Sequence, residues 1–321
     1  MSGTDWRPSA SIETLRVRAL VLRRAREYFA RTGALEVETP VVVRAAVTDL
    51  HLESLEVRRA DGGGAGFLHT SPEYAMKRLL CAGAPDIYQI CRVFREGERG
   101  RLHNPEFTMI EWYRLGIDHH ALMADVERLL RFLLEGLSSP AASQRLTYRA
   151  AFQASLGVDP IDDPVEGLAD ALAARGADLP SGFALERDAL CDLALSLYVA
   201  PSFPKDRFTF LHDFPASQAA LARIDGPVAA RFEAFWGGIE LANGFDELAD
   251  AAEQAARFAA DAAARSRADR PRREPDAAFL AALAAGMPRC AGVALGFDRV
   301  LMIATGARHI DEVVAFPAER A

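Results

Sequence analysis

The sequence predicts an α+β fold in which a largely antiparallel sheet is flanked by helices. Most strand-like segments follow one another through short turns, which is typical of antiparallel hairpins. The clearest pair, residues 88–95 and 105–113, is joined by a charged loop. Hydrophobic residues make up 50% of the 321 residues, which is enough to bury a large core.

The first segments predict a helix followed by a strand. Apolar residues recur on one face of a helix over residues 12–32, and Gly33 is its expected stop. Residues 35–43 alternate and then become apolar, which predicts a strand. Pro40 has no amide donor and therefore belongs at an edge, a bulge or a strand end. The residues that share the helix face are Leu15, Leu22, Ala25 and Phe29.

The rest of the chain predicts further alternation of helices and strands. Ser71-Pro-Glu73 opens a helix, because proline suits the first helical position and an acid suits the first turn. Residues 120–205 are rich in Ala and Leu, acidic and mainly helical, and we interpret them as an insertion in a single domain spanning residues 1–321. Further along we expect strands at 208–212 and 232–241, helices within 249–285, and a Gly-rich strand running into a helix at 291–304.

We assign no function to two polar segments. The Gly-rich residues 61–66 predict a hairpin turn or a mobile loop, and no Lys-Ser/Thr pair follows to make a phosphate loop. His119 and His120 are expected to be exposed to solvent, whereas Met123 and Leu129 are expected in the core.

Charge and composition exclude several classes of protein. The formal net charge is -8, which argues against a large tRNA-binding surface. The sequence has neither an apolar run long enough for a membrane span nor a secretory signal at its start. Its four cysteines lie far apart without a CxxC pair, which favours free thiols in a reducing cytoplasm over a structural zinc site.

Residues 94–113 hold the densest set of chemically active side chains. Strand alternation places Phe107, Met109, Glu111 and Tyr113 on one face. Arg95 ends the opposing strand, and an arginine can hold a phosphate or carboxylate through two hydrogen bonds. Any one of these residues taken alone fits a solvated hairpin with an aromatic core face equally well. The functional interpretation therefore depends on the whole set of residues.

Four segments follow one another along the chain. They are the helix and strand ending at Pro40, the string Phe94-Arg95 with His103-Asn-Pro-Glu-Phe-Thr108, the string Glu233-Ala-Phe-Trp-Gly-Gly-Ile-Glu240-Leu-Ala-Asn-Gly-Phe-Asp-Glu247, and Gly292-Val-Ala-Leu-Gly-Phe-Asp-Arg299. The first, second and fourth resemble motifs 1, 2 and 3 of class II aminoacyl-tRNA synthetases in their lysyl form. The third resembles the lysyl-enzyme segment that holds magnesium and the substrate side chain. Motif 1 forms the dimer interface in that family, so the resemblance implies a homodimer.

The resemblance implies an ATP site. Arg95 would contact the α-phosphate and the substrate carboxylate, and His103 would lie near the γ-phosphate. Phe107 and Arg299 would sandwich the adenine through stacking and a cation–π contact. Arg95 and Arg299 would thus be the catalytic cations. Arg299 also falls at a predicted helix start, where anions bind well.

The resemblance also implies a magnesium site and a pocket for an amino acid. Glu233 and Glu240 would be metal ligands, and two carboxylates beside ATP phosphates suit Mg²⁺. Asn243, Glu247 and Tyr113 would hold a side-chain ammonium, which needs a carboxylate and further acceptors once it leaves water. Glu73 would take the substrate's other amino group and Glu111 would support the pocket. The pocket residues not yet named are Ser71, Ala294 and Gly296.

Two positions depart from the family pattern. The acid that usually follows the motif 2 arginine by two positions, and contacts the adenine amino group, is Gly97 here. Either Glu96 or Glu98 could fill that role through a shifted loop. Ala294 stands where lysyl-tRNA synthetases tend to have glycine, and one methyl group in a tight pocket changes discrimination by about 1–3 kcal/mol. It could therefore distinguish lysine from β-lysine.

Motif 1 begins close to Met1, which leaves no room for the anticodon-reading OB domain of lysyl-tRNA synthetases. The chain thus resembles a catalytic core alone, as in the lysyl-synthetase paralogues that modify elongation factor P. It also resembles these paralogues in the segment Phe214-Pro-Ala-Ser-Gln-Ala-Ala-Leu-Ala222. We therefore expect ATP-dependent activation of lysine or, in preference, (R)-β-lysine, and transfer to elongation factor P rather than tRNA. A truncated tRNA-charging enzyme and a non-catalytic paralogue are the alternatives.

Overall fold

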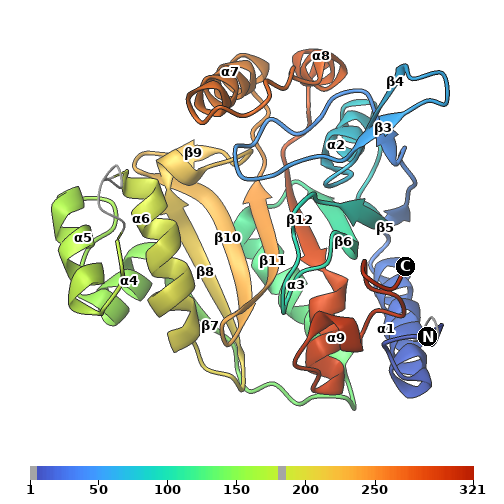
Figure 1. Cartoon of the computed structure of the whole chain (residues 1–321), viewed down its shortest axis with the longest axis horizontal. Helices are drawn as coiled ribbons and strands as arrows, with labels where there is room; N and C mark the ends of the chain where they lie inside the picture. Colours follow the sequence, from blue (N-terminus) through green and yellow to red (C-terminus); the bar gives the residue numbers. More distant parts are fainter. Residues whose placement is uncertain (1–5, 180–185) are drawn as a thin grey trace, which may run out of the picture. The chain divides into compact units, whose positions relative to one another are not determined.

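A computed structural model describes residues 6–179 and 186–321 and has the α+β fold that the sequence predicts (Figure 1). Contacts divide the chain into two compact units, and each is described by itself. The first unit comprises Met1–Ile117, Arg128–Ser139 and Leu248–Ala321, and the second comprises Asp118–Glu127 and Pro140–Glu247.

The main strands of the first unit lie in the order β1, β5, β6 and β12. Pairing is antiparallel except between β1 and β5, which are parallel. Aromatic rings form part of the core, because Phe29 stacks on Tyr88 at 4.2 Å between ring centroids and meets Trp112 edge-on. These strands are β1 (Leu35–Glu36), β5 (Ile87–Phe94), β6 (Glu106–Leu115) and β12 (Cys290–Gly296).

A second, three-stranded sheet in this unit corrects one expectation. Residues 35–43 do not form one strand, because they divide into β1 and into β2 (Val42–Val43) of this other sheet. Pro40 lies between the two pieces, and its missing amide donor explains why the strand does not continue. The expected Gly-rich hairpin turn is confirmed between β3 (Glu56–Arg58) and β4 (Gly64–Leu68).

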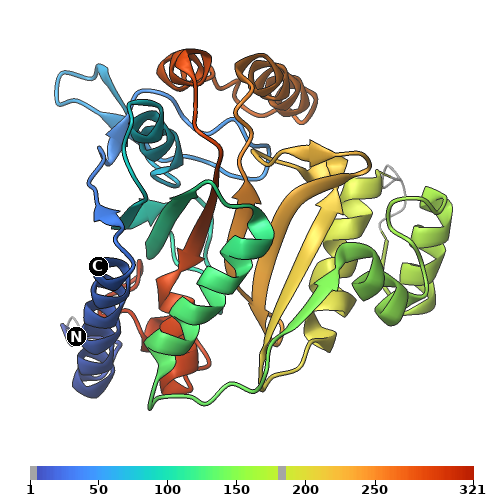
Figure 2. The same cartoon turned by 180° about the vertical axis from the view of Figure 1, so that it is seen from behind.

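The helices of the first unit follow the predicted pattern closely. Ser11 caps the first of them by accepting a hydrogen bond from the Thr14 amide at 3.0 Å. The C-terminal segment runs beside the start of this helix, where the Ser9 amide donates to the Ala315 carbonyl at 2.8 Å (Figures 1 and 2). The helices are α1 (Ile12–Arg31), α2 (Glu73–Cys81), α7 (Ala251–Arg267), α8 (Ala277–Ala285), α9 (Phe297–Thr305) and a 3₁₀ turn at Ile310–Glu312.

Helices α2, α7 and α8 pack on one another through aromatic side chains. Tyr74 of α2 stacks on Phe279 of α8 at 4.8 Å, and Phe258 of α7 lies 5.8 Å from the Tyr74 ring. The expected proline at the first helical position instead lies one residue before α2, because Pro72 is the N-cap residue. The cluster fixes the beginning of α2, on which a candidate site residue, Glu73, is located.

The strands of the second unit lie in the order β11, β10, β8 and β7, with β9 beside β10. The expected single strand at 232–241 is wrong. The chain turns at Gly237-Gly238, where Gly237 has a φ of +56° that favours glycine. These strands are β7 (Gln144–Thr147), β8 (Phe208–Pro215), β9 (Ile224–Asp225), β10 (Val228–Trp236) and β11 (Ile239–Asp246).

Residues 120–205 are mainly helical as expected, although they also contain β7 and although 180–185 lie outside the described residues. Met123 and Leu129 are fully buried, which confirms their expected place in the core. His119, in contrast, is only 7% exposed, so the expectation of an exposed pair holds for His120 alone. The helices are α3 (His119–Leu134), which contributes to both units, α4 (Tyr148–Leu156), α5 (Val165–Ala174), α6 (Arg187–Ala194), a π-helical turn (Leu195–Val199) and 3₁₀ turns at Ala200–Ser202 and Ala216–Gln218.

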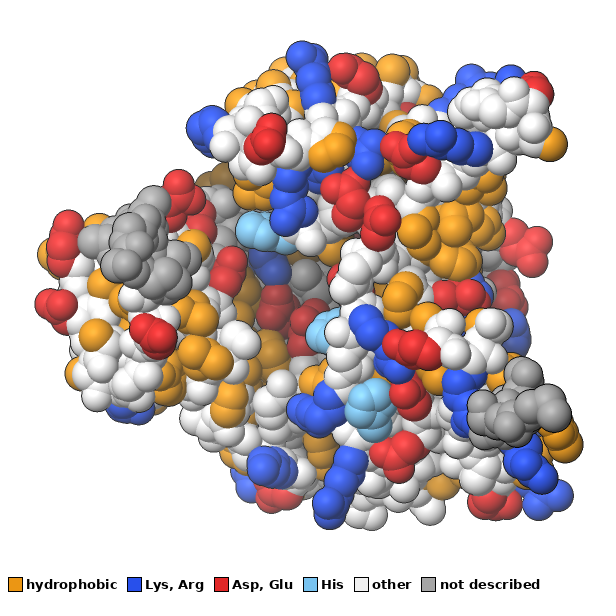
Figure 3. All heavy atoms as spheres, in the orientation of Figure 1, with side chains coloured by type: hydrophobic (Ala, Val, Ile, Leu, Met, Phe, Trp, Pro, Cys, Tyr) orange, Lys and Arg blue, Asp and Glu red, His pale blue; other side chains and the backbone are white. Residues whose placement is uncertain are grey.

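The surface is mixed in charge. On the face drawn in Figure 3, acidic and basic side chains are interspersed, in keeping with the formal net charge of -8. Among the described residues, no helix combines the length and the apolar character that crossing a membrane requires. All four cysteines are free thiols, and Cys191 and Cys290 are buried.

Candidate active site

Three neighbouring strands of the first unit bring one row of side chains together. Residue Glu111 of β6 lies opposite Gln89 of β5 and opposite Ala294 of β12. Residues directly opposite one another in antiparallel strands project from the same face. The register therefore places Ala294 beside Glu111, and the predicted alternation along β6 adds Tyr113 to that face.

Glu111 is the centre of a buried hydrogen-bond network. Its Oε2 accepts from the Ser71 hydroxyl at 2.6 Å, and its Oε1 accepts from the Tyr113 hydroxyl at 2.8 Å. The Ser71 hydroxyl in turn accepts from the Glu73 amide at 3.0 Å. The start of α2 and strand β6 are thus joined through one carboxyl group that is only 3% exposed. Four of the predicted substrate residues, Ser71, Glu73, Glu111 and Tyr113, lie in this network.

Lys77 completes the network, and the sequence interpretation gave it no role. Its Nζ donates to Glu73 Oε1 at 2.6 Å, one helical turn along α2, and its side chain is fully buried. Burial and then the negative charge of Glu73 raise the pKa of Glu111 to about 7, although Ser71, Tyr113 and Lys77 oppose the rise. The Glu73–Lys77 spacing of four residues is the only signal in the sequence that could have revealed this pair.

Gln89 is a second residue that the sequence interpretation missed. It lies opposite Glu111 and is 3% exposed. Its buried amide oxygen accepts no hydrogen bond within the described ranges of the chain. A buried acceptor of this kind usually has a partner, and the ammonium of a substrate would supply one.

Arg95 and Phe107 lie together at the end of the β5–β6 hairpin. The guanidinium carbon of Arg95 stands over the Phe107 ring at 5.1 Å from its centroid, within cation–π range. Arg95 also lies 3.5 Å from the Glu98 carboxylate and donates weakly to the Thr70 carbonyl at 3.4 Å. Gly97, with a φ of +77°, forms the turn that brings Glu98 back to this arginine.

Arg299 projects from the first turn of α9, as predicted, and contacts His103 of the motif 2 loop. The terminal nitrogen of Arg299 lies 2.8 Å from His103 Nε2, and its Nε donates to the Leu102 carbonyl at 3.3 Å. The preceding residue, Asp298, is 2% exposed and accepts from the Thr108 amide at 2.7 Å. This hydrogen bond joins the start of α9 to β6 and so fixes the point from which the Arg299 side chain projects.

The second unit holds another cluster, on strands β10 and β11. Glu233 lies opposite Asn243 in the ladder, and Arg231 contacts both. Arg231 donates to Glu233 Oε1 at 2.5 Å and to the Asn243 side-chain oxygen at 3.3 Å. Its guanidinium also covers the Phe214 ring at 4.4 Å. Arg231, which the sequence interpretation missed, therefore orients a predicted metal ligand and a predicted substrate contact.

The carboxylates of this cluster suit a divalent cation. Burial raises the pKa of Glu233 to about 7, and the charge of Glu240 acts in the same direction against the effect of Arg231. A register shift follows Ala234, so that Glu240 lies opposite Phe235. Glu247 follows β11 directly, is 6% exposed and forms an isolated bridge with Ala222. A cation bound to Glu233 and Glu240 would offset the repulsion between them.

Comparisons with known proteins identify the family of this chain. The family model described as "tRNA synthetases class II (D, K and N)" matches residues 3–320. The chain therefore belongs to the class II tRNA synthetase family that covers the aspartyl, lysyl and asparaginyl enzymes.

Several relatives within this family carry one printed name, "Elongation factor P--(R)-beta-lysine ligase". The Vibrio cholerae relative is 47% identical over 328 residues, and the Pseudoalteromonas translucida relative is 46% identical; both alignments cover all of both chains. The relative from Salmonella gallinarum is 46% identical over 98% of each chain. The chain is thus similar to these ligases over their whole length.

Replacing Glu111 by Gln should flatten the pH dependence of the free energy of unfolding between about pH 4.5 and pH 7. Folded Glu111 holds its proton up to about pH 7, whereas the ordinary value in an unfolded chain is 4.5. The folded state therefore binds more protons in this window, and stability falls as the pH rises through it. Because Glu233 acts with the same sign, the slope should decrease rather than vanish.

Denaturant unfolding at a series of pH values measures this slope. Glu13→Gln, on the exposed face of α1, is a matched control that should leave the slope as in the wild type, since the Glu13 side chain is 75% exposed. Equal slopes in Glu111→Gln and the wild type would contradict the raised pKa.

Proposed function

We propose that the protein is an ATP-dependent, AMP-forming ligase that activates (R)-β-lysine and transfers it to the ε-amine of a lysine on elongation factor P. The observation that carries this proposal is 46–47% identity over whole chains to relatives with that printed name. The buried acids of both units support it, because a diamino acid carries ammonium groups that need carboxylates once they leave water.

The first step would join the amino acid to AMP. The substrate carboxylate attacks the α-phosphorus of ATP, an aminoacyl-adenylate forms, and pyrophosphate leaves. Arg95 would offset charge on the α-phosphate, while Phe107 and Arg299 hold the adenine. Glu98, which pairs with Arg95, or Glu96 would contact the adenine amino group. His103, the hydrogen-bonding neighbour of Arg299, would lie toward the γ-phosphate.

The proposed amino-acid contacts are those that the resemblance to lysyl enzymes implies. Glu73 would bind the amino group nearer the substrate carboxyl, with Ser71 and Glu111 fixing its position through their hydrogen bonds. Tyr113, Asn243 and Glu247 would bind the side-chain ammonium. Gly296, opposite Met109 in the ladder, would leave room for the substrate backbone.

Magnesium is the cation that we propose for Glu233 and Glu240. Mg²⁺ prefers oxygen ligands and keeps few protein carboxylates beside substrate phosphates, which fits this pair. When bound, it would neutralise phosphate charge. Arg231 would hold Glu233 in place for this purpose.

In the second step the ε-amine of a lysine on elongation factor P attacks the adenylate carbonyl. An amide forms, AMP leaves, and the amine gives up its proton. No side chain of the chain is required as a covalent nucleophile. Positioning of the two reactants would supply most of the rate.

We also propose a cytoplasmic homodimer. Large apolar side chains of the segment that resembles motif 1 are exposed in the single chain, including Leu35 at 51% and Val42 at 44%. Exposed apolar residues close together in the sequence are typical of an interaction surface. Free thiols agree with a reducing compartment.

Intact mass measurement of elongation factor P tests the proposed function in one experiment. After incubation with the enzyme, ATP, Mg²⁺ and (R)-β-lysine, its mass should increase by one lysine residue, and lysine should give less product. Arg95→Ala should abolish the increase. The proposal would be contradicted if the mass of elongation factor P stayed unchanged with either isomer while a parallel reaction attached the amino acid to tRNA. That result would favour a tRNA-charging enzyme.

Ala294→Gly should shift the preference from (R)-β-lysine toward lysine. Its methyl group shares a face with Glu111, so removing it creates space where the two isomers differ by the position of one amine. The ratio of the two kcat/KM values should change by about tenfold or more, as pyrophosphate exchange with each isomer would report.

Ala291→Gly is the matched control, since Ala291 lies on the same strand but projects from the other face. It should cost stability and leave the ratio unchanged. A similar change of ratio in both variants would mean that strand flexibility, rather than the Ala294 methyl group, sets the preference.

A further inference from the structure

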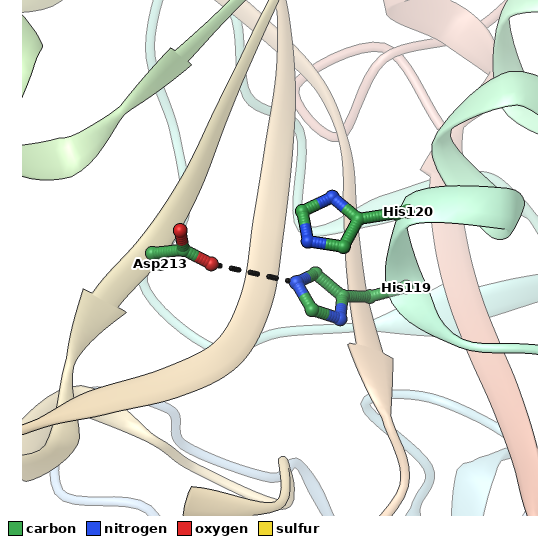
Figure 4. Close-up of side chains that lie close together, drawn as sticks. All are labelled: His119, His120 and Asp213. Carbon is green, nitrogen blue, oxygen red and sulfur yellow. Dashed lines mark ion pairs between the residues drawn. The ribbon is translucent and has the colours of Figure 1, made fainter. Parts of the chain in front are cut away.

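The second unit contains a group of metal-ligating side chains to which the proposed ligase activity assigns no role. His119 and His120 begin α3, and Asp213 lies on β8. Each offers one ligand atom, and these atoms all lie within 4.8 Å of one another. Figure 4 shows the His119 ring facing the Asp213 carboxylate, with the His120 ring alongside.

The backbone is arranged to bring these groups together. Asp213 has a φ of +59°, in the left-handed region that few residues other than glycine, asparagine and aspartate adopt. On the partner strand β10 the register shifts between Ala229 and Phe232, which is a β-bulge. Bulges turn side chains away from regular alternation. Here His212 and Asp213, although adjacent in a strand, contact each other, with His212 Nδ1 at 3.0 Å from Asp213 Oδ2.

His119 has one long ion-pair contact, with Asp213, and no side-chain hydrogen bond among the described residues. Its side chain is 9% exposed, and neither ring nitrogen makes a hydrogen bond in the part of the chain that the structure describes. The His119 Nε2 points at Asp213 Oδ1 from 3.5 Å, too far for a good hydrogen bond. A buried polar group in this condition is costly unless another ligand satisfies it.

We propose that His119, His120 and Asp213 form a zinc site. With bonds of about 2.0–2.2 Å and tetrahedral angles, two ligand atoms of one Zn²⁺ stand about 3.4 Å apart. The separation of 3.5 Å between His119 Nε2 and Asp213 Oδ1 matches this value. The exposed His120 ring would complete the set by a shift on the order of 1 Å, which leaves a fourth position open.

The ligand set discriminates between metals. Two imidazoles and one carboxylate suit Zn²⁺, whereas Mg²⁺ prefers oxygen ligands alone. His212 contacts the other oxygen of Asp213 and so would orient the carboxylate. An ion held here would tie the beginning of α3 to β8 within the second unit.

Zinc titration of the full-length protein by calorimetry, in saturating Mg²⁺, tests this proposal. Saturating Mg²⁺ keeps zinc from being counted at Glu233 and Glu240. The wild type should bind one Zn²⁺ per chain, and the affinity should fall tenfold or more in Asp213→Asn and in His120→Gln. Asparagine tolerates the left-handed conformation of residue 213, and His120 is exposed, so both variants should fold.

His51→Gln, at an exposed histidine of the first unit, is the control and should bind zinc as the wild type does. Circular dichroism and the Tm verify that each variant is folded. The proposal is overturned if the wild type binds no zinc under these conditions. It is equally overturned if Asp213→Asn and His120→Gln retain wild-type affinity while folded.

Discussion

A single buried carboxyl group organises the amino-acid side of the candidate active site. Glu111 receives hydrogen bonds from Ser71 at the start of α2 and from Tyr113 on its own strand. Burial of such a group is unfavourable unless hydrogen bonds satisfy it. This one residue therefore joins the start of α2 to β6, and the position of the proposed substrate contact Glu73 depends on that connection.

Internal cations accompany the buried acids in both units. Lys77 holds Glu73, and Arg231 holds Glu233. Removing one member of a buried pair leaves an uncompensated charge, which is strongly destabilising. These cations thus orient the acids that they contact. If the proposed substrate ammonium and divalent ion bind here, they would meet carboxyl groups that are already in place, so less reorganisation would be needed during the reaction.

The sequence predicted the elements whose signals are local. Helix α1, the β5–β6 hairpin and the strand-to-helix passage at Arg299 follow from periodicity, turn residues and glycines, and the structure has them as expected. The strand at 35–43 was wrong because its two apolar halves join different sheets on either side of Pro40, a choice made by distant partners. The strand at 232–241 was wrong because its Gly-Gly pair is a turn.

The candidate site shows the same difference between residues with a signal in the sequence and residues brought together by distant strands. Ser71, Glu73, Glu111 and Tyr113 were predicted as pocket residues by resemblance, and the structure joins them in one network. Gln89 and Arg231 escaped notice because their importance comes from register, which brings residues of separate strands together. His119 was expected to be exposed because a histidine pair at a helix start is polar, whereas its burial near Asp213 depends on residues distant in the sequence and has no local signal.

We propose that the Glu111 network and Arg95 bind an aminoacyl-adenylate. A crystal structure with a non-hydrolysable β-lysyl-adenylate analogue tests it most directly. We expect the adenine to stack on Phe107, the phosphate to take Arg95 from Glu98, and the amino group nearer the carbonyl to bind Glu73. An analogue bound elsewhere, with Arg95 still on Glu98 and Glu73 contacted by Lys77 alone, would contradict it.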